Sequence, residues 1–569
     1  GMGGVNTVDY RASAAGGRGE QRVVIGSTAQ SGGQTGNDAD GDILKNFRNL
    51  IGSAYNDTLI GDGGSNVLLG LAGNDILVGL GGADTIDGGS GVNTVDYSLS
   101  TAGVRIDLTK QDGSTSQSGG RAGNDADGDV LTNIQNVIGT AYNDTLIGDA
   151  NDNLLLGLAG ADYIDGGGGI NTVDYSASTA GVFINLNLQD GHIMQNGGGA
   201  GNHAAGDILL QIRNVIGTAY NDTLMGDAND NLLAGLAGAD NINGGGGVNT
   251  VDYSASTAGV NIDLTHQDGV AAQSGGVAGN HADGDVLQNI QNVIGTAYND
   301  TIIGDSHNNV MAGLGGADRI DGGGGINTVD YSASTAGIRI DLNIQDGVHA
   351  QHYGEAGNHS EGDILTNIQN VIGSNHDDFI CGDDHNNVLY GMSGNDTLIG
   401  GGGNDILHGG DGIKYMYGYS GDDVLHLSLN TKGLLDGTTI QSKMIGALEG
   451  GTGVDSLVLD SHGGSGVTLD LHSLVTSAKI TGIEHIDITG GAGDNNIMTL
   501  QASDVLGTAG SHSLFIEGDG GDTVTTSDSG WTSGGGDVSV NGQTYHHYVN
   551  GAEHLYIDVD ITNQNVIHP

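Results

Sequence analysis

Aspartate and asparagine side chains recur every nine residues along much of this chain, a spacing that can build oxygen-rich metal sites. The stretch from Ile138 to Val173 shows the pattern as four blocks: IGTAYNDTL, IGDANDNLL, LGLAGADYI and DGGGGINTV. Each block has glycine second, Asp or Asn seventh and an aliphatic residue last. Carboxylate and carbonyl oxygens are the hard ligands that Ca²⁺ takes several at a time. The pattern therefore predicts a series of Ca²⁺ sites.

Short strands and glycine-rich turns are the elements that would position these side chains. The aliphatic residue of each block should point inward from a strand, and the turn should need glycine at its φ > 0 positions. Two blocks then make one coil, coils pair their strands in parallel, and stacked turns surround the ion with oxygen. We predict an all-β fold: a Ca²⁺-bound parallel β-roll solenoid with inserted loops and a C-terminal β-rich capping domain. A disordered Gly- and Asp-rich linker is the alternative, which the regular aliphatic column disfavours.

The ligand column alternates between acid and amide in the second to fourth long repeats. Successive blocks should fall on opposite sides of the roll, so one edge should present carboxylates and the other amides. The amide edge has its own carboxylate after the glycine, at Asp149, Asp227 and Asp305. We expect tight Ca²⁺ binding at the Asp edge and weaker or absent binding at the Asn edge. The alternative is that Asn carbonyl oxygens serve equally well and both edges fill.

The candidate Ca²⁺ ligands include aspartates of the seventh column and aspartates beside the glycines. They are Asp57, Asp62, Asp75, Asp84, Asp144, Asp149, Asp162, Asp165, Asp222, Asp227, Asp240, Asp300, Asp305, Asp318, Asp321, Asp378, Asp383, Asp396, Asp405 and Asp423. Lys414 interrupts the column in the fifth repeat and should silence its site. A transition-metal site among His349, His352, His359, His376 and His385 is possible, but their spacing favours scattered surface histidines.

A repeat of 78 residues overlies the short one. The tripeptide Val-Asp-Tyr ends at Tyr10, Tyr97, Tyr175, Tyr253 and Tyr331, and the first spacing of 87 residues reflects an extra nonapeptide at 78–86. This half coil should move the first repeat's loop to the opposite side. The predicted units are 1–95, 96–173, 174–251, 252–329 and 330–426, followed by a β-rich cap at 427–569 with an Asn541-Gly542 hairpin. Each standard unit should amount to roughly four coils, so that loops recur every ~19 Å.

Between the nonapeptides, each repeat carries 42 residues with a polar run, Gln111 to Gly128 in the second repeat. Asp125, Asp127 and Asp129 follow one another at alternate positions there, and Asp38, Asp40 and Asp42 do so in the first repeat. Alternate carboxylates can chelate Ca²⁺. A solvated loop is nearly as well supported, because the third repeat keeps only Asp207.

The composition is consistent with a thin roll and argues against several classes of protein. The chain has 569 residues with 109 Gly, 1 Pro, 4% aromatic residues and a net charge of −54, which would be self-repelling unless cations neutralise it. Such a charge argues against nucleic acid as a partner. Adaptation to high salt is a weaker explanation of the acidic composition, because the aspartates recur at fixed positions of the nonapeptide. The lone Cys381 allows no intrachain disulfide, and no apolar run approaches the ~20 residues of a membrane helix.

The nonapeptides resemble those of RTX proteins secreted by type I systems. The C-terminal part, with Ser503–Leu506, Phe515–Val524, Trp531, Tyr545–Tyr548 and Leu555–Asp558, is similar to the C-termini of large RTX adhesins. The resemblance implies a C-terminal secretion signal, export in an unfolded state through type I secretion machinery, and folding outside the cell where Ca²⁺ is abundant.

Three classes of function remain open. The near-identical units favour a non-enzymatic extracellular structural protein: an adhesin, biofilm-matrix or surface-layer component that self-associates or contacts cell surfaces or polysaccharides. The non-catalytic part of a secreted enzyme is the second class, although neither G-x-S-x-G nor H-E-x-x-H occurs here. A carbohydrate-binding module is the third, and the absence of Trp from the repeats argues against it.

Overall fold

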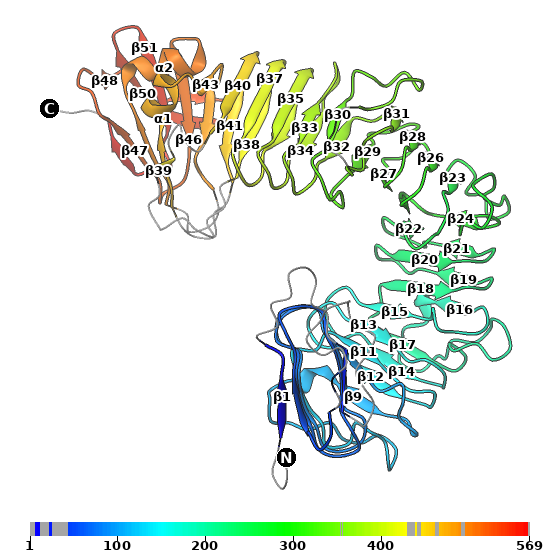
Figure 1. Cartoon of the computed structure of the whole chain (residues 1–569). Helices are drawn as coiled ribbons and strands as arrows, with labels where there is room; N and C mark the ends of the chain where they lie inside the picture. The colour runs from blue at the N-terminus through cyan, green and yellow to red at the C-terminus, as the bar shows by residue number, and fades with distance from the viewer. Residues whose placement is uncertain are drawn as a thin grey trace. The chain divides into compact units, whose positions relative to one another are not determined.

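The computed structural model describes residues 6–11, 22–25, 42, 44–352, 354, 357–428, 439–440, 445–460, 466–490 and 495–566. These residues form mostly short strands, many of them paired in parallel, which confirms the predicted all-β roll (Figure 1). The chain divides into two compact units, residues 1–256 with 266–292 and residues 257–265 with 293–569. No helix in the described residues is long and apolar enough to span a membrane.

Unit 1 has strands on two faces. One face is a single parallel sheet, which we call the continuous sheet. Its strands are β2 (Arg22–Val24), β4 (Thr58–Ile60), β6 (Ile76–Val78), β8 (Thr94–Asp96), β11 (Asn136–Ile138), β13 (Leu154–Leu156), β15 (Thr172–Asp174), β18 (Asn214–Thr218), β20 (Leu232–Leu236) and β22 (Thr250–Asp252).

The opposite face of unit 1, which we call the broken face, consists of three shorter parallel sheets. The first has β1 (Thr7–Asp9), β3 (Asn49–Ile51), β5 (Val67–Leu69), β7 (Thr85–Asp87) and β10 (Val130–Thr132). The second has β9 (Arg105–Asp107), β12 (Thr145–Ile147), β14 (Tyr163–Asp165) and β17 (Ile208–Leu210), and the third β16 (Phe183–Asn185), β19 (Thr223–Met225), β21 (Asn241–Asn243) and β24 (Val286–Gln288). Two 3₁₀ turns, η1 (Leu108–Lys110) and η2 (Leu186–Leu188), follow β9 and β16.

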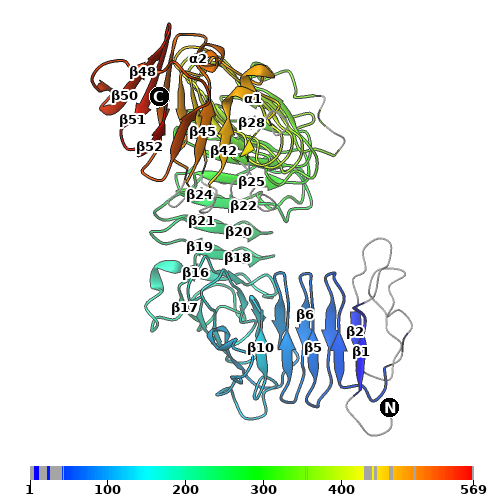
Figure 2. The ribbon, with the colours of Figure 1, turned by 90° about the vertical axis from the view of Figure 1, so that its left-hand side faces the viewer.

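Successive nonapeptides fall on opposite faces, as predicted. On the continuous sheet Val137 pairs with Leu155 and Leu155 with Val173, whereas Leu146 pairs with Ile164 on the broken face. Two blocks therefore make one coil. All five side chains are fully buried, because alternate residues of a strand point to opposite sides. Figure 2 shows the strands of unit 1 around β5 and β10 side by side.

The inserted 42 residues add unequal numbers of strands to the two faces. On the broken face β10 pairs with β7 and β9 pairs with β12, so the sheet is interrupted between β10 and β9. The second repeat contributes three strands to the continuous sheet (β11, β13, β15) and four to the broken face (β9, β10, β12, β14). The prediction of about four coils per unit holds for one face only. At ~4.8 Å per layer, loops recur every ~14 Å along the continuous sheet rather than every ~19 Å.

The extra nonapeptide exchanges the faces of the first repeat. β1, its Val-Asp-Tyr strand, lies on the broken face, whereas the equivalent β8, β15 and β22 lie in the continuous sheet. β2 likewise lies in the continuous sheet, whereas its counterparts β9 and β16 do not. The strands of the first repeat thus exchange faces, as the predicted displacement of its loop requires. The first loop itself, with Asp38 and Asp40, lies outside the described residues.

The turns depend on glycine mainly through close approach. A Cβ at Gly139 would lie 2.5 Å from Asp144 Oδ2 and 3.1 Å from the carbonyl oxygen of Gly157 in the next coil. The prediction that only glycine serves the φ > 0 positions is wrong. Leu158 has φ 63°, because the modest cost of a left-handed residue, ~1 kcal/mol, is tolerable in an ordered turn.

Unit 2 repeats this plan. Its continuous sheet has β25 (Asn292–Thr296), β27 (Val310–Leu314), β29 (Thr328–Asp330), β32 (Asn370–Ile372), β34 (Val388–Tyr390), β36 (Ile406–His408), β38 (Val424–Leu427), β41 (Ser456–Leu459), β44 (His485–Asp487), β46 (Ser513–Glu517) and β51 (Glu553–Asp558). The opposite face has β23 (Asn261–Asp263), β26 (Thr301–Ile303), β28 (Arg319–Asp321) and β31 (Ile364–Thr366), then β30 (Arg339–Asp341), β33 (Phe379–Cys381), β35 (Thr397–Gly402), β37 (Tyr415–Ser420), β40 (Ala447–Thr452) and β43 (Ile480–Thr481). A last parallel sheet has β39 (Thr439–Ile440), β42 (Thr468–Asp470), β45 (Ile497–Leu500), β47 (Thr523–Thr526) and β52 (Asn563–Asn565).

The strand stacks continue past the predicted start of the cap at residue 427. Leu425 pairs with Leu457, Leu457 with Ile486 and Ile486 with Ile516, although the nonapeptide pattern has faded. Two short helices, α1 (Leu471–Thr476) and α2 (Ala502–Ala509), are inserted. The cap proper is antiparallel and comprises β48 (Thr532–Ser533), β49 (Val538–Val540) and β50 (Gln543–Asn550), with β50 covering β51.

The predicted hairpin joins β49 to β50, where Val540 pairs with Gln543. Its two loop residues, Asn541 and Gly542, have φ of 52° and 94°, as a primed turn requires. The antiparallel strands thus close an edge that would otherwise be open to pairing with other chains.

Candidate metal sites

The Asp column forms hydrogen-bonded ladders along the edge of the roll. In the second repeat the Val104 N–H donates to Asp144 Oδ1, the Asp144 N–H to Asp162 Oδ1, and the Asp162 N–H to Asp207 Oδ1, each at 2.8 Å. The same order recurs at Asp222, Asp240 and Asp285 in unit 1, and at Asp300, Asp318 and Asp363 in unit 2. Each ladder therefore stacks three carboxylates whose surroundings differ.

The first carboxylate of each ladder is satisfied within its own turn. Thr140 donates its N–H to Asp144 Oδ2 at 2.6 Å and its hydroxyl to Asp144 Oδ1 at 2.9 Å. The same Thr or Ser contact is made to Asp57, Asp222, Asp300 and Asp378. In the sequence, a Thr or Ser directly after the glycine of a block indicates this contact.

The second carboxylate keeps one oxygen without a partner. Asp162 is buried and its Oδ2 accepts no hydrogen bond. The same holds for Asp75, Asp84, Asp240, Asp318, Asp405, Asp423 and Asp455. Burial, with the charge of Asp285 second, raises the pKa of Asp240 to about 9. Leaving such a carboxylate buried and charged is costly, so the arrangement requires a cation or a proton.

Asp455 was not among the predicted ligands. It ends the segment Gly450-Gly451-Thr452-Gly453-Val454-Asp455, which repeats the glycine and aspartate positions of a nonapeptide. The Asp423 N–H donates to Asp455 Oδ1 at 2.8 Å, which makes it the next level of the ladder through Asp405 and Asp423. The nonapeptide pattern is lost in the surrounding sequence, so the sequence alone does not indicate Asp455 as a ligand.

Lys414 shows where the roll accommodates a positive charge. Its Nζ lies 2.5 Å from Asp396 Oδ2 and donates to the carbonyl oxygen of Gly394 at 2.8 Å, and both charged side chains are fully buried. The ammonium thus takes the oxygen that the equivalent aspartates leave unpaired. This agrees with the expectation that Lys414 silences the Ca²⁺ site at its level.

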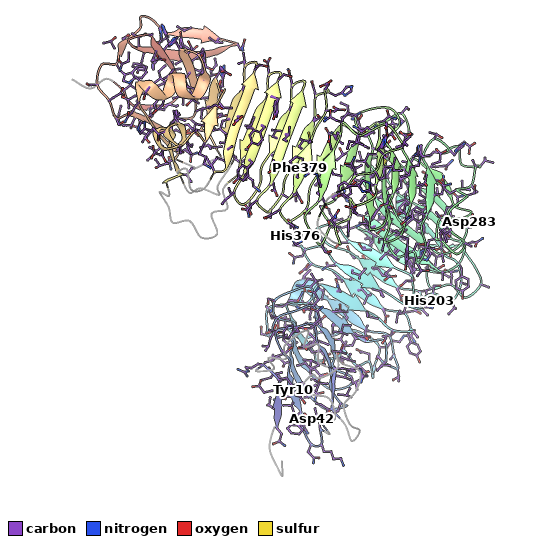
Figure 3. The ribbon with its side chains drawn as sticks, turned by 45° about the horizontal axis from the view of Figure 1, so that its top comes forward. Tyr10, Asp42, His203, Asp283, His376 and Phe379 are labelled. Carbon is purple, nitrogen blue, oxygen red and sulfur yellow. The ribbon has the colours of Figure 1, made fainter. Side chains whose placement is uncertain are left out.

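A tyrosine hydroxyl satisfies the third carboxylate. The Tyr175 O–H donates to Asp207 Oδ2 at 2.9 Å. The equivalent pairs are Tyr10–Asp42 (labelled in Figure 3), Tyr97–Asp129, Tyr253–Asp285 and Tyr331–Asp363. Asp129 is buried in the ladder, where it also accepts the Asp84 N–H, whereas Asp127 is exposed on the loop.

The Asn edge is saturated by its own amides. Asn153 accepts the Asp149 N–H at 2.8 Å through Oδ1, and its Nδ2 donates to the carbonyl oxygen of Gln135 at 2.8 Å. Asn171 Nδ2 likewise donates to the carbonyl oxygen of Gly168 at 2.8 Å. An amide that donates to a turn carbonyl takes the place of a cation there. The two edges are unlike, as the alternation in the sequence predicted.

The remaining predicted aspartates stabilise turns. Asp149 accepts the Asn151 N–H through Oδ1 and the Asn151 amide through Oδ2, both at 2.9 Å. Asp62, Asp227, Asp305 and Asp383 each accept the N–H two residues on, and Asp165 and Asp321 accept those of Gly167 and Gly323. These contacts are Asx turns. Among the predicted histidines, His349, His352 and His385 pair with carboxylates rather than with one another.

A family model described as the RTX calcium-binding nonapeptide repeat (4 copies) matches residues 49–77, 60–95, 138–173, 216–251, 294–329 and 382–413. The chain contains RTX calcium-binding repeats. A comparison with curated proteins finds no match. The matched residues hold six of the eight aspartates with an unpaired oxygen, all but Asp423 and Asp455.

The residues of the RTX ladders fit Ca²⁺. Eight described aspartates offer a buried, unpartnered oxygen, and at a further level an ammonium already fills the equivalent place. Bound there, Ca²⁺ supplies the charge that buried carboxylates need. The RTX repeats thus imply Ca²⁺ binding, and the eight aspartates with an unpaired oxygen are the candidates that the structure favours as its ligands.

Proposed function

We propose that this protein is a non-enzymatic extracellular structural protein, exported through type I secretion machinery, that folds when Ca²⁺ binds its RTX ladders. The observation that carries the proposal is the column of unpaired, buried Asp Oδ2 atoms. With a net charge of −54, the chain has a strong driving force to stay extended where Ca²⁺ is scarce. Because Ca²⁺ binds the folded roll and not the extended chain, it stabilises the roll by mass action.

Repetitive contact, as in an adhesin, biofilm-matrix or surface-layer component, is supported by side chains that recur at equivalent exposed positions. Tyr142, Tyr220 and Tyr298 are 45%, 48% and 48% exposed. The aliphatic side chains of Ile170, Val248 and Ile326 are also exposed in successive repeats. Identical groups at regular intervals suit self-association or contact with a repetitive partner such as a cell-surface polysaccharide.

The outer side of the continuous sheet in unit 1 adds a groove of about 620 Å³. Its apolar lining includes Val92, Leu154, Ile170, Ile216, Leu232 and Leu236. An apolar recess lined by residues of successive repeats is consistent with a surface used for contact rather than for catalysis.

Sedimentation and electron microscopy of the purified chain in millimolar Ca²⁺ and in EGTA test this proposal. We expect an expanded monomer in EGTA, and a compact roll that assembles or binds a glycan surface in Ca²⁺. The triple substitution Tyr142→Ser, Tyr220→Ser and Tyr298→Ser should abolish assembly and leave the Ca²⁺-induced circular dichroism signal unchanged. A matched triple substitution of the exposed residues Thr179, Thr257 and Thr335 by Ala should leave both the assembly and the Ca²⁺-induced signal unchanged. A strict monomer in Ca²⁺ that binds no surface would contradict the structural role.

A further inference from the structure

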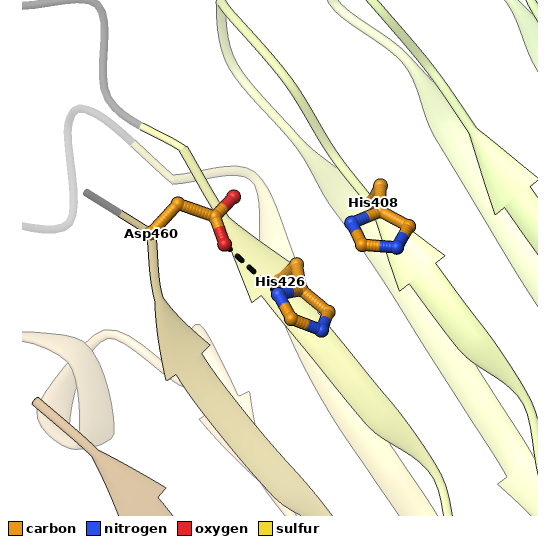
Figure 4. A group of neighbouring side chains, drawn as sticks. All are labelled: His408, His426 and Asp460. Atoms are coloured by element: carbon orange, nitrogen blue, oxygen red, sulfur yellow. Dashed lines mark hydrogen bonds and ion pairs between the residues drawn. The ribbon is translucent and has the colours of Figure 1, made fainter. Parts of the chain in front are cut away.

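Three side chains from consecutive coils meet on the outer side of the continuous sheet in unit 2. His408 ends β36, His426 lies in β38 and Asp460 directly follows β41 (Figure 4). Parallel pairing sets His408 opposite His426. Because the intervening side chains of Leu407 and Leu425 point into the core, the alternation of the strand places both imidazoles outside.

Stacking and one ion pair hold the cluster. The ring centroids of Tyr390 and His408 are 4.4 Å apart, and those of His408 and His426 are 4.3 Å apart. His426 Nδ1 lies 2.9 Å from Asp460 Oδ1. Within the described part of the chain, the His408 side chain makes no hydrogen bond or ion pair. One ligand atom from each of the three side chains lies within 4.8 Å of the others.

We propose that His408, His426 and Asp460 bind a divalent transition metal ion of the Zn²⁺ type, which clamps three consecutive coils together. Two imidazole nitrogens with one carboxylate oxygen suit Zn²⁺, and water can complete its coordination. Ca²⁺ prefers oxygen ligands alone, as at the Asp ladders. The cluster is thus chemically distinct from the RTX sites.

The geometry is near that of a bound site. Ligand atoms of a tetrahedral Zn²⁺ site with bonds of ~2.0–2.1 Å lie ~3.3 Å apart, so atoms within 4.8 Å of one another have to approach by at most about 1.5 Å. The lone pairs of stacked rings lie in the ring planes, and the 25° angle between the His408 and His426 rings already departs from parallel. The side chains of His426 and Asp460 are 23% and 31% exposed, which leaves room for rotation and for entry of the ion.

Isothermal titration with Zn²⁺ in saturating Ca²⁺ tests the site in the full chain. We expect a stoichiometric site that is lost in His408→Ala and in His426→Ala and weakened at least tenfold in Asp460→Asn. The control His349→Ala removes an exposed histidine that pairs with Asp346 and should leave the site intact. Equal Zn²⁺ binding by the original chain and by His408→Ala would overturn the proposal.

The melting temperature tests whether the ion links the coils, and circular dichroism detects a variant that does not fold. Zn²⁺ should raise the melting temperature of the Ca²⁺-loaded chain but not that of His408→Gln, whose fold is checked by circular dichroism. Co²⁺ should give visible absorption that His408→Gln lacks. The pair His547–His554, with nitrogens 2.8 Å apart, is an alternative site in unit 2. Loss of Zn²⁺ binding in His547→Ala but not in His408→Gln would assign the ion to that pair and reject the cluster.

Discussion

At the scale of single residues, aspartates with the same place in the sequence pattern have different partners. The carboxylate of Asp144 is taken by Thr140, that of Asp207 by Tyr175, and that of Asp162 keeps an unpaired oxygen. Each standard repeat of unit 1 therefore offers one unpaired Asp where the sequence suggested several. Thr140 and Tyr175 satisfy the first and third carboxylates of the ladder, whereas Asp162, the second, needs an ion or a proton.

Asp162→Asn should remove one Ca²⁺ from the total bound. The amide supplies a donor where the ion needs an acceptor, as Asn153 does on the opposite edge. Ca²⁺ counting by titration on the purified chain measures the change, with Asp190→Asn, an exposed loop substitution, as the control. An unchanged Ca²⁺ count in Asp162→Asn would show that this carboxylate is not a ligand.

Asp396→Asn should destabilise the Ca²⁺-loaded chain by about 3 kcal/mol or more, because it leaves the buried Lys414 ammonium without its counter-charge. Urea unfolding followed by circular dichroism gives the difference. The double substitution Asp396→Asn with Lys414→Met should recover most of the loss, and Asp384→Asn at an exposed turn should have little effect. A single variant as stable as the original chain would argue against a buried ion pair.

At the scale of elements, two glutamines fix the inserted loop of the third repeat to the roll. Gln195 accepts the Asn185 N–H at 2.8 Å and donates back to its carbonyl oxygen at 3.3 Å. Gln189 exchanges the same pair of bonds with the backbone of Ile212, at 2.7 and 2.8 Å. The polar run, which the sequence predicts to be a loop, is therefore attached to the roll through the backbone of Asn185 and of Ile212.

Gln195→Ala should loosen the third repeat's loop without unfolding the roll. It leaves the buried polar backbone groups of Asn185 unpaired, at a local cost of about 1–3 kcal/mol. Hydrogen exchange of residues 186–207 should speed up correspondingly, while that of β18 and β20 stays slow. Asn196→Ala, at an exposed neighbour, is the matched control. Unaltered exchange in the loop would mean that Gln195 is not its anchor.

At the scale of the whole molecule, the buried carboxyls link folding to both protons and Ca²⁺. The pKa of Asp240 rises from an ordinary 3.8 to about 9, and that of Asp84 to about 8, burial being the first cause in both. Without Ca²⁺ the folded roll therefore binds more protons than the unfolded chain. The stability that these groups contribute is fully present below pH ~4 and is lost as the pH rises towards 9.

In EGTA the roll should keep more of its structure at pH 5 than at pH 8. Thermal melting by circular dichroism from pH 5 to 9 measures this, and millimolar Ca²⁺ should abolish most of the loss at high pH. Raising NaCl to 1 M at pH 8 is the control, because screening lowers the repulsion among exposed charges but does not ligate buried oxygens. A Ca²⁺-free chain that gains stability as the pH rises would refute this linkage.

The sequence by itself determined the features that depend on nine consecutive residues. The aliphatic column gave the core, the alternation of Asp and Asn gave unlike edges, and the extra nonapeptide gave the exchange of faces. Such features are local, because the geometry of one strand and one turn decides them. Only the tertiary structure decided the partners of Asp162, Lys414 and His408. Asp207 meets Asp162 across 45 residues, and His408 meets Asp460 across an inserted segment, so their contacts depend on where each long excursion rejoins the stack.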